Sequence, residues 1–544
     1  MTPRRKSEAV QKKLRVEDIS KPGGPLTEVR NEDLIPLPGP PGEPEGTPKP
    51  TPLAPEVQQH IEAILDDTSA LSIPKPASPE EEEKLVAAFL RGLRKLFSKT
   101  DNWTFLRPLL LSIEHCAHCQ TCSAACHVFE ASGRNELYRP TYRSEVFRRL
   151  VQKYVKPGGK VLARWRHGDV ELNWQTIVRL AELAYRCNLC RRCAQTCPIG
   201  VDNALIAREI RKLMSQELGI APRELHERGT VRQLKTGSST GMSPAAMKDN
   251  MEFIDGEMSE LTGLKIKTPM DKEGADVLLI HNAGEILAWP ENPGAFAVIL
   301  QAAGVNWTLS SDLLGYDSVN YGLFYDDVQL AKVVIRQMQA AKKLKAKKIV
   351  VGECGHAHKA LITVADRVLP GELQIPRESG LTFLEHIVFG GQIAFDPKRN
   401  DFPVTLHDPC NVVRNLGIVE PQRRILRHLC PGFREMTPHG VHNFCCGGGS
   451  GFAIMSGNKF DEWRFRVAGR KKMQQILEAF ADDLTPETWK YLCAPCSNCK
   501  GQFRDMFTYY RIWEKCGIMY GGLAELIVNA MTAVKKPFLE WEWH

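Results

Sequence analysis

Two short cysteine motifs constrain this chain more than any other feature of its sequence. Both have the spacing C-x2-C-x2-C-x3-C. The cysteines of the first are Cys116, Cys119, Cys122 and Cys126, and those of the second are Cys187, Cys190, Cys193 and Cys197. A [4Fe–4S] cluster takes one thiolate for each iron, and in two-cluster proteins the fourth cysteine of one motif ligates the other cluster. The motifs therefore predict two cubane [4Fe–4S] clusters.

The same rule predicts how the cysteines are shared. We expect one cluster on Cys116, Cys119, Cys122 and Cys197, and the other on Cys187, Cys190, Cys193 and Cys126. Pro198 follows the second motif, whereas His127 follows the first, a change that removes no ligand. Zinc is the alternative metal, but zinc sites are usually built from two C-x2-C pairs.

Three arginines flank the second motif, namely Arg186, Arg191 and Arg192. We expect them on solvated helix faces, as for most arginines. The alternative is that their charges raise the reduction potential of the nearby cluster.

The composition excludes several classes of protein. Of 544 residues, 43% are hydrophobic and 25% are charged, which is ordinary for globular domains. The net charge of +7 comes without clustered basic residues and interleaved aromatics, so nucleic-acid binding is not indicated. The 17 cysteines lie in a long chain without a secretory signal or an apolar run of membrane-spanning length, which favours metal ligation in the cytoplasm over disulfides.

The chain is predicted to contain six segments. They are a proline-rich disordered or extended arm (1–54), a helical lead-in (55–113), an α-helical ferredoxin domain (114–236), a polar connector (237–275) and two lobes (276–385 and 402–544). Helices are expected over residues 55–71, from Pro79, and over 101–113, 142–154 and 173–186.

The two lobes alternate strand and helix patterns. Strands are expected at 277–280, 349–351 and 403–406, and helices at 326–343 and 459–480. Such alternation is typical of parallel α/β units. The predicted fold class is therefore α+β and multidomain, with an α-helical two-cluster ferredoxin domain followed by a two-lobed α/β domain.

A second constellation of cysteines lies in the last lobe. It reads His407-Asp408-Pro409-Cys410, then Cys445-Cys446-Gly447-Gly448-Gly449, then Cys493-Ala494-Pro495-Cys496-Ser497-Asn498-Cys499. A vicinal disulfide is disfavoured in a reducing cytosol, and the glycine run lacks the Lys-Ser/Thr of a phosphate-binding loop. The clustering favours a third metal site.

This constellation, with Lys500-Gly501-Gln502 after it, resembles the CCG motif of heterodisulfide reductases. Two ferredoxin motifs before a CCG unit resemble the D-type subunits of those enzymes. They resemble most closely the DsrK (HmeD) family of iron–sulfur subunits, found in membrane complexes of dissimilatory sulfur metabolism. The segment 138–145 supports this family, and the resemblance covers roughly residues 80–544.

The resemblance implies a CCG domain with a noncubane [4Fe–4S] cluster. Its ligands would be Cys410, Cys445, Cys446, Cys496 and Cys499. It also implies a complex that is peripheral to the cytoplasmic membrane. Menaquinol would be oxidised at a membrane haem b subunit (DsrM-like), and electrons would pass through the cubanes to a disulfide or trisulfide of the small sulfur-carrier protein DsrC.

The chain departs from the family pattern at two places. Cys493 is an extra cysteine, so Cys493 and Cys496 could replace Cys496 and Cys499 as the last ligands. The first lobe has Asn282-Ala283-Gly284 and Asn320-Tyr321-Gly322 where ligands would be expected, which predicts a degenerate CCG lobe without a cluster.

Four other residues are candidates near the third site, namely Cys354, His356, His358 and His407. Pseudo-symmetry would bring Cys354 there as a redox relay or extra ligand, or it could be a buried thiol. We include Cys354 and His356 among the catalytic candidates. Cys430 and Cys516 lie outside every motif and are expected to be structural.

Two other functions remain open at this point. The chain could be the iron–sulfur subunit of a flavin-linked lactate or glycerol-3-phosphate dehydrogenase that feeds quinone. It could also be a non-catalytic electron-transfer subunit in which the CCG unit is a zinc or docking module.

Overall fold

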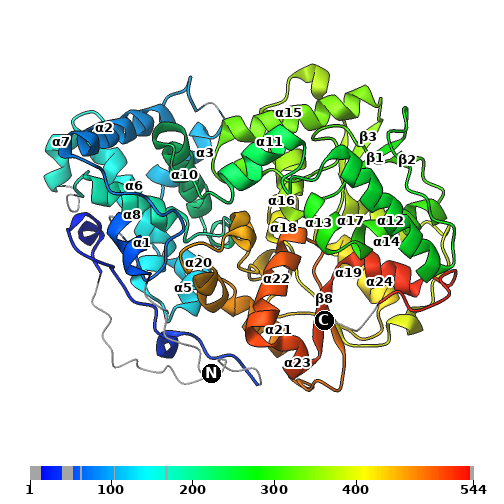
Figure 1. The fold of residues 1–544 in the computed structure, drawn as a ribbon. Coiled ribbons are helices and arrows are strands. Elements are labelled where there is room, and N and C mark those ends of the chain that lie inside the picture. The colour runs from blue at the N-terminus through cyan, green and yellow to red at the C-terminus, as the bar shows by residue number, and fades with distance from the viewer. Residues whose placement is uncertain (1–13, 40–52, 62–63, 103, 166–169, 540–544) are drawn as a thin grey trace. The chain divides into compact units, whose positions relative to one another are not determined.

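The computed structural model describes residues 14–39, 53–61, 64–102, 104–165 and 170–539 (Figure 1). The chain divides into two compact units. Unit 1 comprises Met1–Pro36, Glu45–Pro222 and Met455–Lys472, and unit 2 comprises Leu37–Pro44, Arg223–Ile454 and Met473–His544. Each unit therefore contains segments that are far apart in the sequence.

Unit 1 is helical, and none of the eight β-strands in the described part of the chain belongs to it. Its α-helices are α1 (Pro55–His60), α2 (Pro79–Leu96), α3 (Leu106–Glu114), α4 (Thr121–Ala125), α5 (His127–Ala131), α6 (Pro140–Tyr154), α7 (Gly159–Leu162), α8 (Trp174–Ala184), α9 (Arg192–Gln195), α10 (Asn203–Leu218) and α20 (Phe460–Trp463). Short 3-10 helices are η1 (Val16–Ser20), η2 (Asn31–Asp33), η3 (Glu136–Tyr138) and η4 (Ala163–Trp165), and η13 (Arg464–Ala468) is a π-helical turn.

Local capping explains where the long helices of unit 1 begin. The Ser78 side chain accepts a hydrogen bond from the Glu81 amide, Pro79 occupies the first turn, and acidic residues follow it, so the predicted start of α2 is confirmed. The Asp202 carboxylate caps α10 in the same way, directly after the second cysteine motif. Because α10 packs against α2 and α8, this cap fixes the cysteine loops to the helical core.

The N-terminal arm differs from the expected disordered or extended segment. Over residues 14–39 it contains η1 and η2, and Ile19 is buried. The Arg179 guanidinium donates hydrogen bonds to the carbonyls of Ile19, Lys21 and Gly23, which attaches the arm to α8. The rest of that prediction, at 1–13 and 40–52, lies outside the described residues. The helix expected over 55–71 ends at His60.

Unit 2 contains two four-stranded sheets, and every pairing in them is parallel. The first has the order β2-β1-β3-β4 and the second has the order β6-β5-β7-β8. The strands are β1 (Val277–Ile280), β2 (Trp307–Thr308), β3 (Lys348–Val351), β4 (Arg377–Ser379), β5 (Val404–Leu406), β6 (Phe433–Arg434), β7 (Lys490–Cys493) and β8 (Ile518–Gly521). The predicted strands at 277–280, 349–351 and 403–406 are confirmed, as is the α+β fold class.

Helices precede, connect and follow these strands. They are α11 (Arg232–Thr236), α12 (Pro244–Thr262), α13 (Ala283–Ala288), α14 (Glu291–Ala302), α15 (Asp327–Lys343), α16 (Gly355–His358), α17 (Gly380–Val388), α18 (Cys410–Asn415), α19 (Glu420–Leu429), α22 (Ser497–Tyr510), α23 (Ile512–Cys516) and α24 (Leu523–Ala530), while α21 (Arg470–Ala479) crosses the boundary between the units. Short 3-10 or π-helical turns are η5 (His226–Val231), η6 (Tyr321–Phe324), η7 (Lys359–Val364), η8 (Ala365–Arg367), η9 (Gly371–Leu373), η10 (Pro397–Asn400), η11 (Gly440–His442) and η12 (Gly449–Ile454).

The two sheets of unit 2 have the same topology. In each, the first strand in sequence pairs with the second and the third, and the third pairs with the fourth. Ile280 lies opposite Val351 in the first sheet as Leu406 lies opposite Cys493 in the second. These registers make His281 the counterpart of His407, and Cys354 the counterpart of Cys496.

Two predicted segments are corrected in the structure. Residues 237–275 do not form a simple polar connector, because they contain α12, whose Met251 and Ile254 are buried in the core of unit 2. The single helix expected over 459–480 is instead α20, the π-helical turn η13 and α21.

None of the helices in the described part of the chain combines the length and hydrophobicity needed to cross a membrane.

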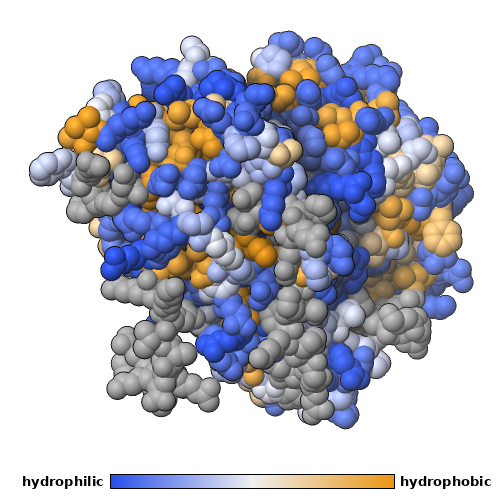
Figure 2. All heavy atoms as spheres, turned by 60° about the vertical axis from the view of Figure 1, so that its left-hand side comes forward, coloured by the Kyte–Doolittle hydropathy of each residue, from blue (hydrophilic) through white to orange (hydrophobic). Residues whose placement is uncertain are grey.

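Most large apolar side chains of the described residues are buried. Exceptions include Val161 and Trp165 in unit 1, which are 75% and 86% exposed. On the face shown in Figure 2, hydrophobic residues form separate patches among hydrophilic ones.

Candidate metal centres

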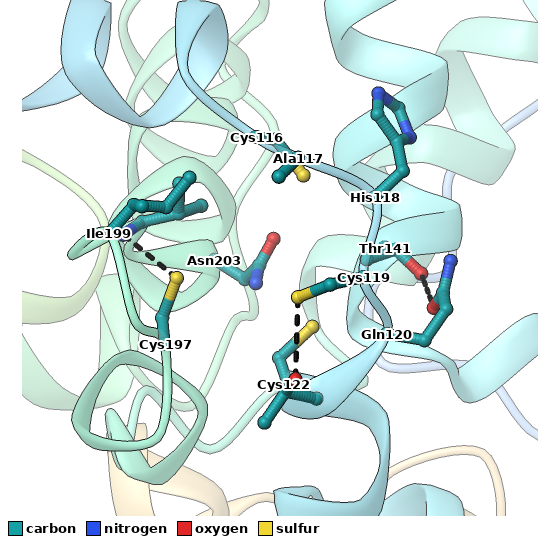
Figure 3. Close-up of a pocket in the computed structure, with 12 residues that line it drawn as sticks. Cys116, Ala117, His118, Cys119, Gln120, Cys122, Thr141, Cys197, Ile199 and Asn203 are labelled. Carbon is teal, nitrogen blue, oxygen red and sulfur yellow. Dashed lines mark hydrogen bonds between the residues drawn. The ribbon is translucent and has the colours of Figure 1, made fainter.

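Four cysteines of unit 1 surround one small cavity (Figure 3). They are Cys116, Cys119, Cys122 and Cys197, the set expected to share a cluster. Cys119 is exposed and Cys122 is buried, so this cavity opens to the surface beside Cys119. The Val201 amide donates to the Cys197 sulfur at 3.3 Å, and the Thr121 hydroxyl lies 3.3 Å from the Cys119 sulfur.

The remaining four motif cysteines line a second cavity of unit 1. They are Cys126, Cys187, Cys190 and Cys193. His127 follows the first motif as Pro198 follows the second. Its Nδ1 lies 4.0 Å from the Cys190 sulfur, and its Nε2 lies 2.9 Å from the Asn188 side-chain oxygen. The structure thus brings together both sets of four cysteines.

The two motifs bend in the same unusual way, which sequence reasoning missed. The residues on either side of the second cysteine have positive φ angles, namely His118 and Gln120 in the first motif and Leu189 and Arg191 in the second. Left-handed backbone is unfavourable for residues other than glycine. Its repetition at equivalent positions indicates a loop shape that the cysteine geometry requires.

Arg186 is buried, so its predicted position on a solvated face is wrong. Its guanidinium donates to both carboxylate oxygens of Asp66 at 3.2 Å and to the Glu182 carboxylate at 3.3 Å. It also lies over the rings of Phe460 and Trp463, 5.2 and 5.1 Å from their centroids. Arg191 forms an ion pair with Asp202, and Arg192 donates to the Ala125 carbonyl.

The donor chemistry of both cavities fits iron–sulfur clusters. Burial, with the charges of neighbouring cysteines, raises the pKa of Cys122 to about 11. Burial likewise raises the pKa of Cys126 to about 12. Crowded thiolates of this kind need a positive centre, which cluster irons provide when they bind and deprotonate the thiols.

The third candidate site lies at the carboxyl edge of the second sheet. Ligands gather at this edge in parallel sheets because the loops that leave neighbouring strands meet there. His407 directly follows β5, Cys410 begins α18, and Cys496 and Cys499 lie where β7 leads into α22. The loop that carries Cys445 and Cys446 precedes η12, in which Ser450 and Gly451 have positive φ angles.

Three groups at this edge converge closely. The Cys446 and Cys499 sulfurs lie 3.3 Å apart, and His407 Nε2 lies 3.3 Å from the Cys499 sulfur. Hydrogen bonds with Cys445 and Cys499 hold the pKa of Cys446 well below its usual value. This chemistry of the donor set fits a metal or cluster that binds thiolates.

Of the two alternative ligands, Cys499 faces this site and Cys493 does not. Cys493 ends β7, belongs to the buried core of unit 2, and has its pKa raised by burial and by the charges of Glu353 and Cys430. Cys410 is also buried and begins α18, which packs against α16.

The half of unit 2 that is built on the first sheet contributes groups to the same site. The Gly355 amide donates to the Cys496 sulfur at 3.3 Å, and burial beside Cys496 raises the pKa of Cys354 to about 12. His356 Nδ1 lies 3.3 Å from the Cys354 sulfur. His358 instead donates to the Cys354 carbonyl and accepts from Ser379, which is a structural role.

Comparison with known proteins agrees with this arrangement. Residues 112–201 match the family described as 4Fe-4S dicluster domain, and residues 404–504 match the CCG cysteine-rich domain. The chain is 27% identical to the "Hdr-like menaquinol oxidoreductase iron-sulfur subunit 2" of Archaeoglobus fulgidus, over 82% of this chain and 83% of the relative. The corresponding protein of Archaeoglobus profundus is 26% identical, over 78% and 80%.

More distant similarity extends to methanogens. The chain is 23% identical to the D-type subunit of the dihydromethanophenazine:CoB–CoM heterodisulfide reductase of Methanosarcina acetivorans, over 63% of this chain and 79% of the relative. The chain is similar to heterodisulfide reductase-like iron–sulfur subunits. The resemblance predicted from the motifs is thereby confirmed, and so is the presence of a 4Fe-4S dicluster domain and a CCG cysteine-rich domain.

Proposed function

We propose that this heterodisulfide reductase-like chain is the iron–sulfur catalytic subunit of a complex that associates with the membrane through a partner protein. Electrons from menaquinol would pass through a haem b subunit (DsrM-like) and two cubane clusters in unit 1. They would reach a noncubane [4Fe–4S] cluster on Cys410, Cys445, Cys446, Cys496 and Cys499. The substrate would be a disulfide or trisulfide of a sulfur-carrier protein of the DsrC type.

One observation carries this proposal. Cys446, Cys499 and His407 converge at the carboxyl edge of a sheet, in a chain that also places eight cysteines around two further cavities. A chain that only transferred electrons would not need the third set of thiols. The similarity to menaquinol oxidoreductase subunits and to the D-type subunit of a heterodisulfide reductase supports the proposed donor and reaction.

The residues around the third site have distinct tasks. A bound cluster would supply single electrons, and cleavage of an S–S bond needs two. His407 would stabilise added negative charge through its hydrogen bond to Cys499, as hydrogen bonds to cluster sulfurs do. The Gly355 amide would likewise stabilise negative charge on the Cys496 sulfur through its hydrogen bond.

The first experiment counts iron after anaerobic purification. We expect about 12 irons per chain in the wild type and about four fewer in Cys446→Ala. Cys430→Ala is the matched control, because Cys430 is buried in the same unit but lies in the hydrophobic core. About eight irons in both wild type and Cys446→Ala would contradict the third cluster.

The second experiment measures S–S reduction. The wild type, supplied with a reduced viologen or a menaquinol analogue, should reduce a purified DsrC-type trisulfide. Cys446→Ala should keep reducible cubanes but lose this activity. If a wild type with about 12 irons reduces no S–S substrate, the catalytic role is wrong.

A zinc module is the second candidate function, because two thiols and one imidazole converge as they do in many zinc sites. Metal analysis of the same samples separates the two candidates. Zinc at about one equivalent per chain, with about eight irons, would identify a non-catalytic electron-transfer subunit. Co-purification with a flavoprotein would instead favour the dehydrogenase alternative.

A further inference from the structure

Unit 2 contains a large cavity on the side of the second sheet where β8 and α24 meet. Its volume is about 780 Å³, and its ionisable lining residues include Glu257, Glu291, Arg504, Tyr520, Glu525 and Lys536. A polar space of this size can hold ordered water. Glu525 is 1% exposed, so it connects the cavity to the interior.

A group of buried charges extends inward from this cavity. Glu285, Glu353 and Lys500 are fully buried, and Lys500 Nζ lies 3.2 Å from a Glu285 carboxylate oxygen. Glu353 and Glu525 both border Gly522, where a Cβ would collide with a carboxyl oxygen of each. The two carboxylates are therefore close neighbours, and position 522 has no room for a side chain larger than hydrogen.

Three carboxyl oxygens in this group have no hydrogen-bond partner among the described residues, namely Glu285 Oε1, Glu353 Oε2 and Glu525 Oε1, although the first is ion-paired with Lys500. The other Glu353 oxygen accepts from the amides of Leu523 and Ala524, both at 2.9 Å. Asn292 donates to the second oxygen of Glu525 at 3.1 Å. A buried acceptor left without a donor is costly, and the cost is removed when the carboxyl group carries a proton.

The buried carboxylates and Lys500 do not balance in charge unless some of the carboxyl groups are protonated. Glu291 at the cavity and the buried Glu285, Glu353 and Glu525 share one buried cation, Lys500, so full ionisation would leave an excess of negative charge. Burial and the Glu525 charge raise the pKa of Glu291 to about 7 and that of Glu353 to about 8. Protons are thus exchangeable here near neutral pH.

The inner end of the group reaches the third site. Glu353 directly precedes Cys354, and its carbonyl accepts from the Ser497 amide at 2.8 Å. The Glu285 carboxylate accepts from the Asn282 amide at 3.4 Å, and the Asn282 side chain lies 2.8 Å from the Ser497 hydroxyl and 3.8 Å from the Cys354 sulfur. These contacts connect the carboxylates with the loop between Cys496 and Cys499.

We propose that Glu291, Glu525, Glu353 and Glu285 form a proton path from the cavity to the third cysteine site. This inference rests on the proposed function. Cleavage of R–S–S–R′ consumes two electrons, delivered from quinol through the iron–sulfur clusters, and two protons, and yields R–SH and R′–SH. The path supplies those protons from cavity water, and each carboxylate is reprotonated from the cavity side.

Lys500 has a positioning role in this path. Its Nζ lies 3.2 Å from a Glu285 carboxylate oxygen, and both side chains are fully buried. Lys500 therefore holds the inner carboxylate in place, while protons move among the glutamates.

The test compares Glu525→Gln with Glu257→Gln in the holoenzyme. Both residues line the cavity, but Glu257 is exposed on α12. With reduced viologen and a DsrC-type trisulfide, Glu525→Gln should lower the turnover rate about 100-fold and enlarge the solvent deuterium isotope effect. Cubane reduction and iron content should stay unchanged, and Glu257→Gln should behave as the wild type.

An infrared readout is independent of turnover. The protonated carboxyl band of the oxidised holoenzyme should weaken in both Glu291→Gln and Glu353→Gln, but not in Glu257→Gln. Wild-type turnover in a fully loaded Glu525→Gln, or a carboxyl band untouched by both substitutions, would overturn the path. A wild type that shows the band but reduces no S–S substrate would instead contradict the proposed function.

Discussion

Cys354 and Cys496 occupy equivalent positions in the two halves of unit 2, each three residues after a central parallel strand. The Cys354 amide contacts the Gly352 carbonyl as the Cys496 amide contacts that of Ala494. The equivalence explains how a lobe without a CCG motif still places a thiol at the third site. Only Cys496 belongs to the CCG motif. We therefore expect Cys496 to bind the cluster and Cys354 to lie beside it without binding iron.

These two roles predict different effects of removing each thiol. Cys496→Ala should lose about four irons per chain, whereas Cys354→Ala should keep all of them. Iron and sulfide analysis of anaerobically purified variants measures both. Loss of iron from Cys354→Ala would show that Cys354 is itself a ligand.

Replacement of His407 should lower the reduction potential of the third cluster. His407→Leu removes the contact with the Cys499 sulfur, and a hydrogen bond to sulfur favours the reduced, more negative state. His281→Leu is the matched control, because His281 follows the first strand of the first sheet as His407 follows the first strand of the second. A redox titration followed by electron paramagnetic resonance gives the potential, with the two cubane signals as internal references. Equal potentials in both variants would exclude this role for His407.

Removal of Arg186 should destabilise unit 1 strongly. Arg186→Met leaves Asp66 and Glu182 buried without their cation, which costs about 3–5 kcal/mol. Arg134→Met, which breaks the exposed pair with Glu130, should cost about 0–1 kcal/mol. Urea unfolding under anaerobic conditions measures both. Similar midpoints for the two variants would mean that the buried network contributes little.

Unit 2 should lose stability in mild acid. Burial lowers the pKa of His281 and His356 to about 3 and that of His358 to about 4, below the unfolded value of about 6.5. The unfolded chain therefore takes up protons first as the pH falls. Each histidine should reduce stability by up to about 1.4 kcal/mol per pH unit between about pH 6 and its folded pKa. Urea unfolding at pH 7, 6 and 5 tests this, and His358→Gln should show a shallower decline.

The cysteine loop of the first motif should tolerate glycine at one position and not at its neighbour. His118 has a φ of 54°, so His118→Gly relieves strain and should leave stability unchanged or raise it by up to about 1 kcal/mol. Ala117 does not have a positive φ, so Ala117→Gly should cost about 0.5–1 kcal/mol. Unfolding free energies of the loaded proteins measure the difference. The opposite order would show that the loop adopts another shape in solution.

The parts of the fold that depend on local patterns could be predicted from sequence. Ser78, Pro79 and the acidic residues after them form one local signal, and it fixes the start of α2. Buried parallel strands such as β1 and β3 read as short runs of valine, isoleucine and leucine. Cysteine spacing predicted which four thiols would surround each cavity of unit 1.

Features that depend on distant partners could not be predicted in this way. Arg186 looks like any surface arginine until Asp66, 120 residues earlier, is placed against it. The carboxylates near Lys500 come from separate segments of the chain, so no motif contains them. The break at η13 lies within the short segment 455–472 that belongs to unit 1, which helical periodicity does not reveal.

The contact of Arg186 with Phe460 and Trp463 has a consequence for how this protein is made. Residues 455–472 belong to unit 1, although they are synthesised after most of unit 2. A nascent chain cannot enclose the Arg186 network until the ribosome has passed residue 472. If iron were loaded into the second cavity during translation, it would bind before Phe460 and Trp463 had packed over Arg186. A gene fragment ending at residue 222 would encode an unfinished domain.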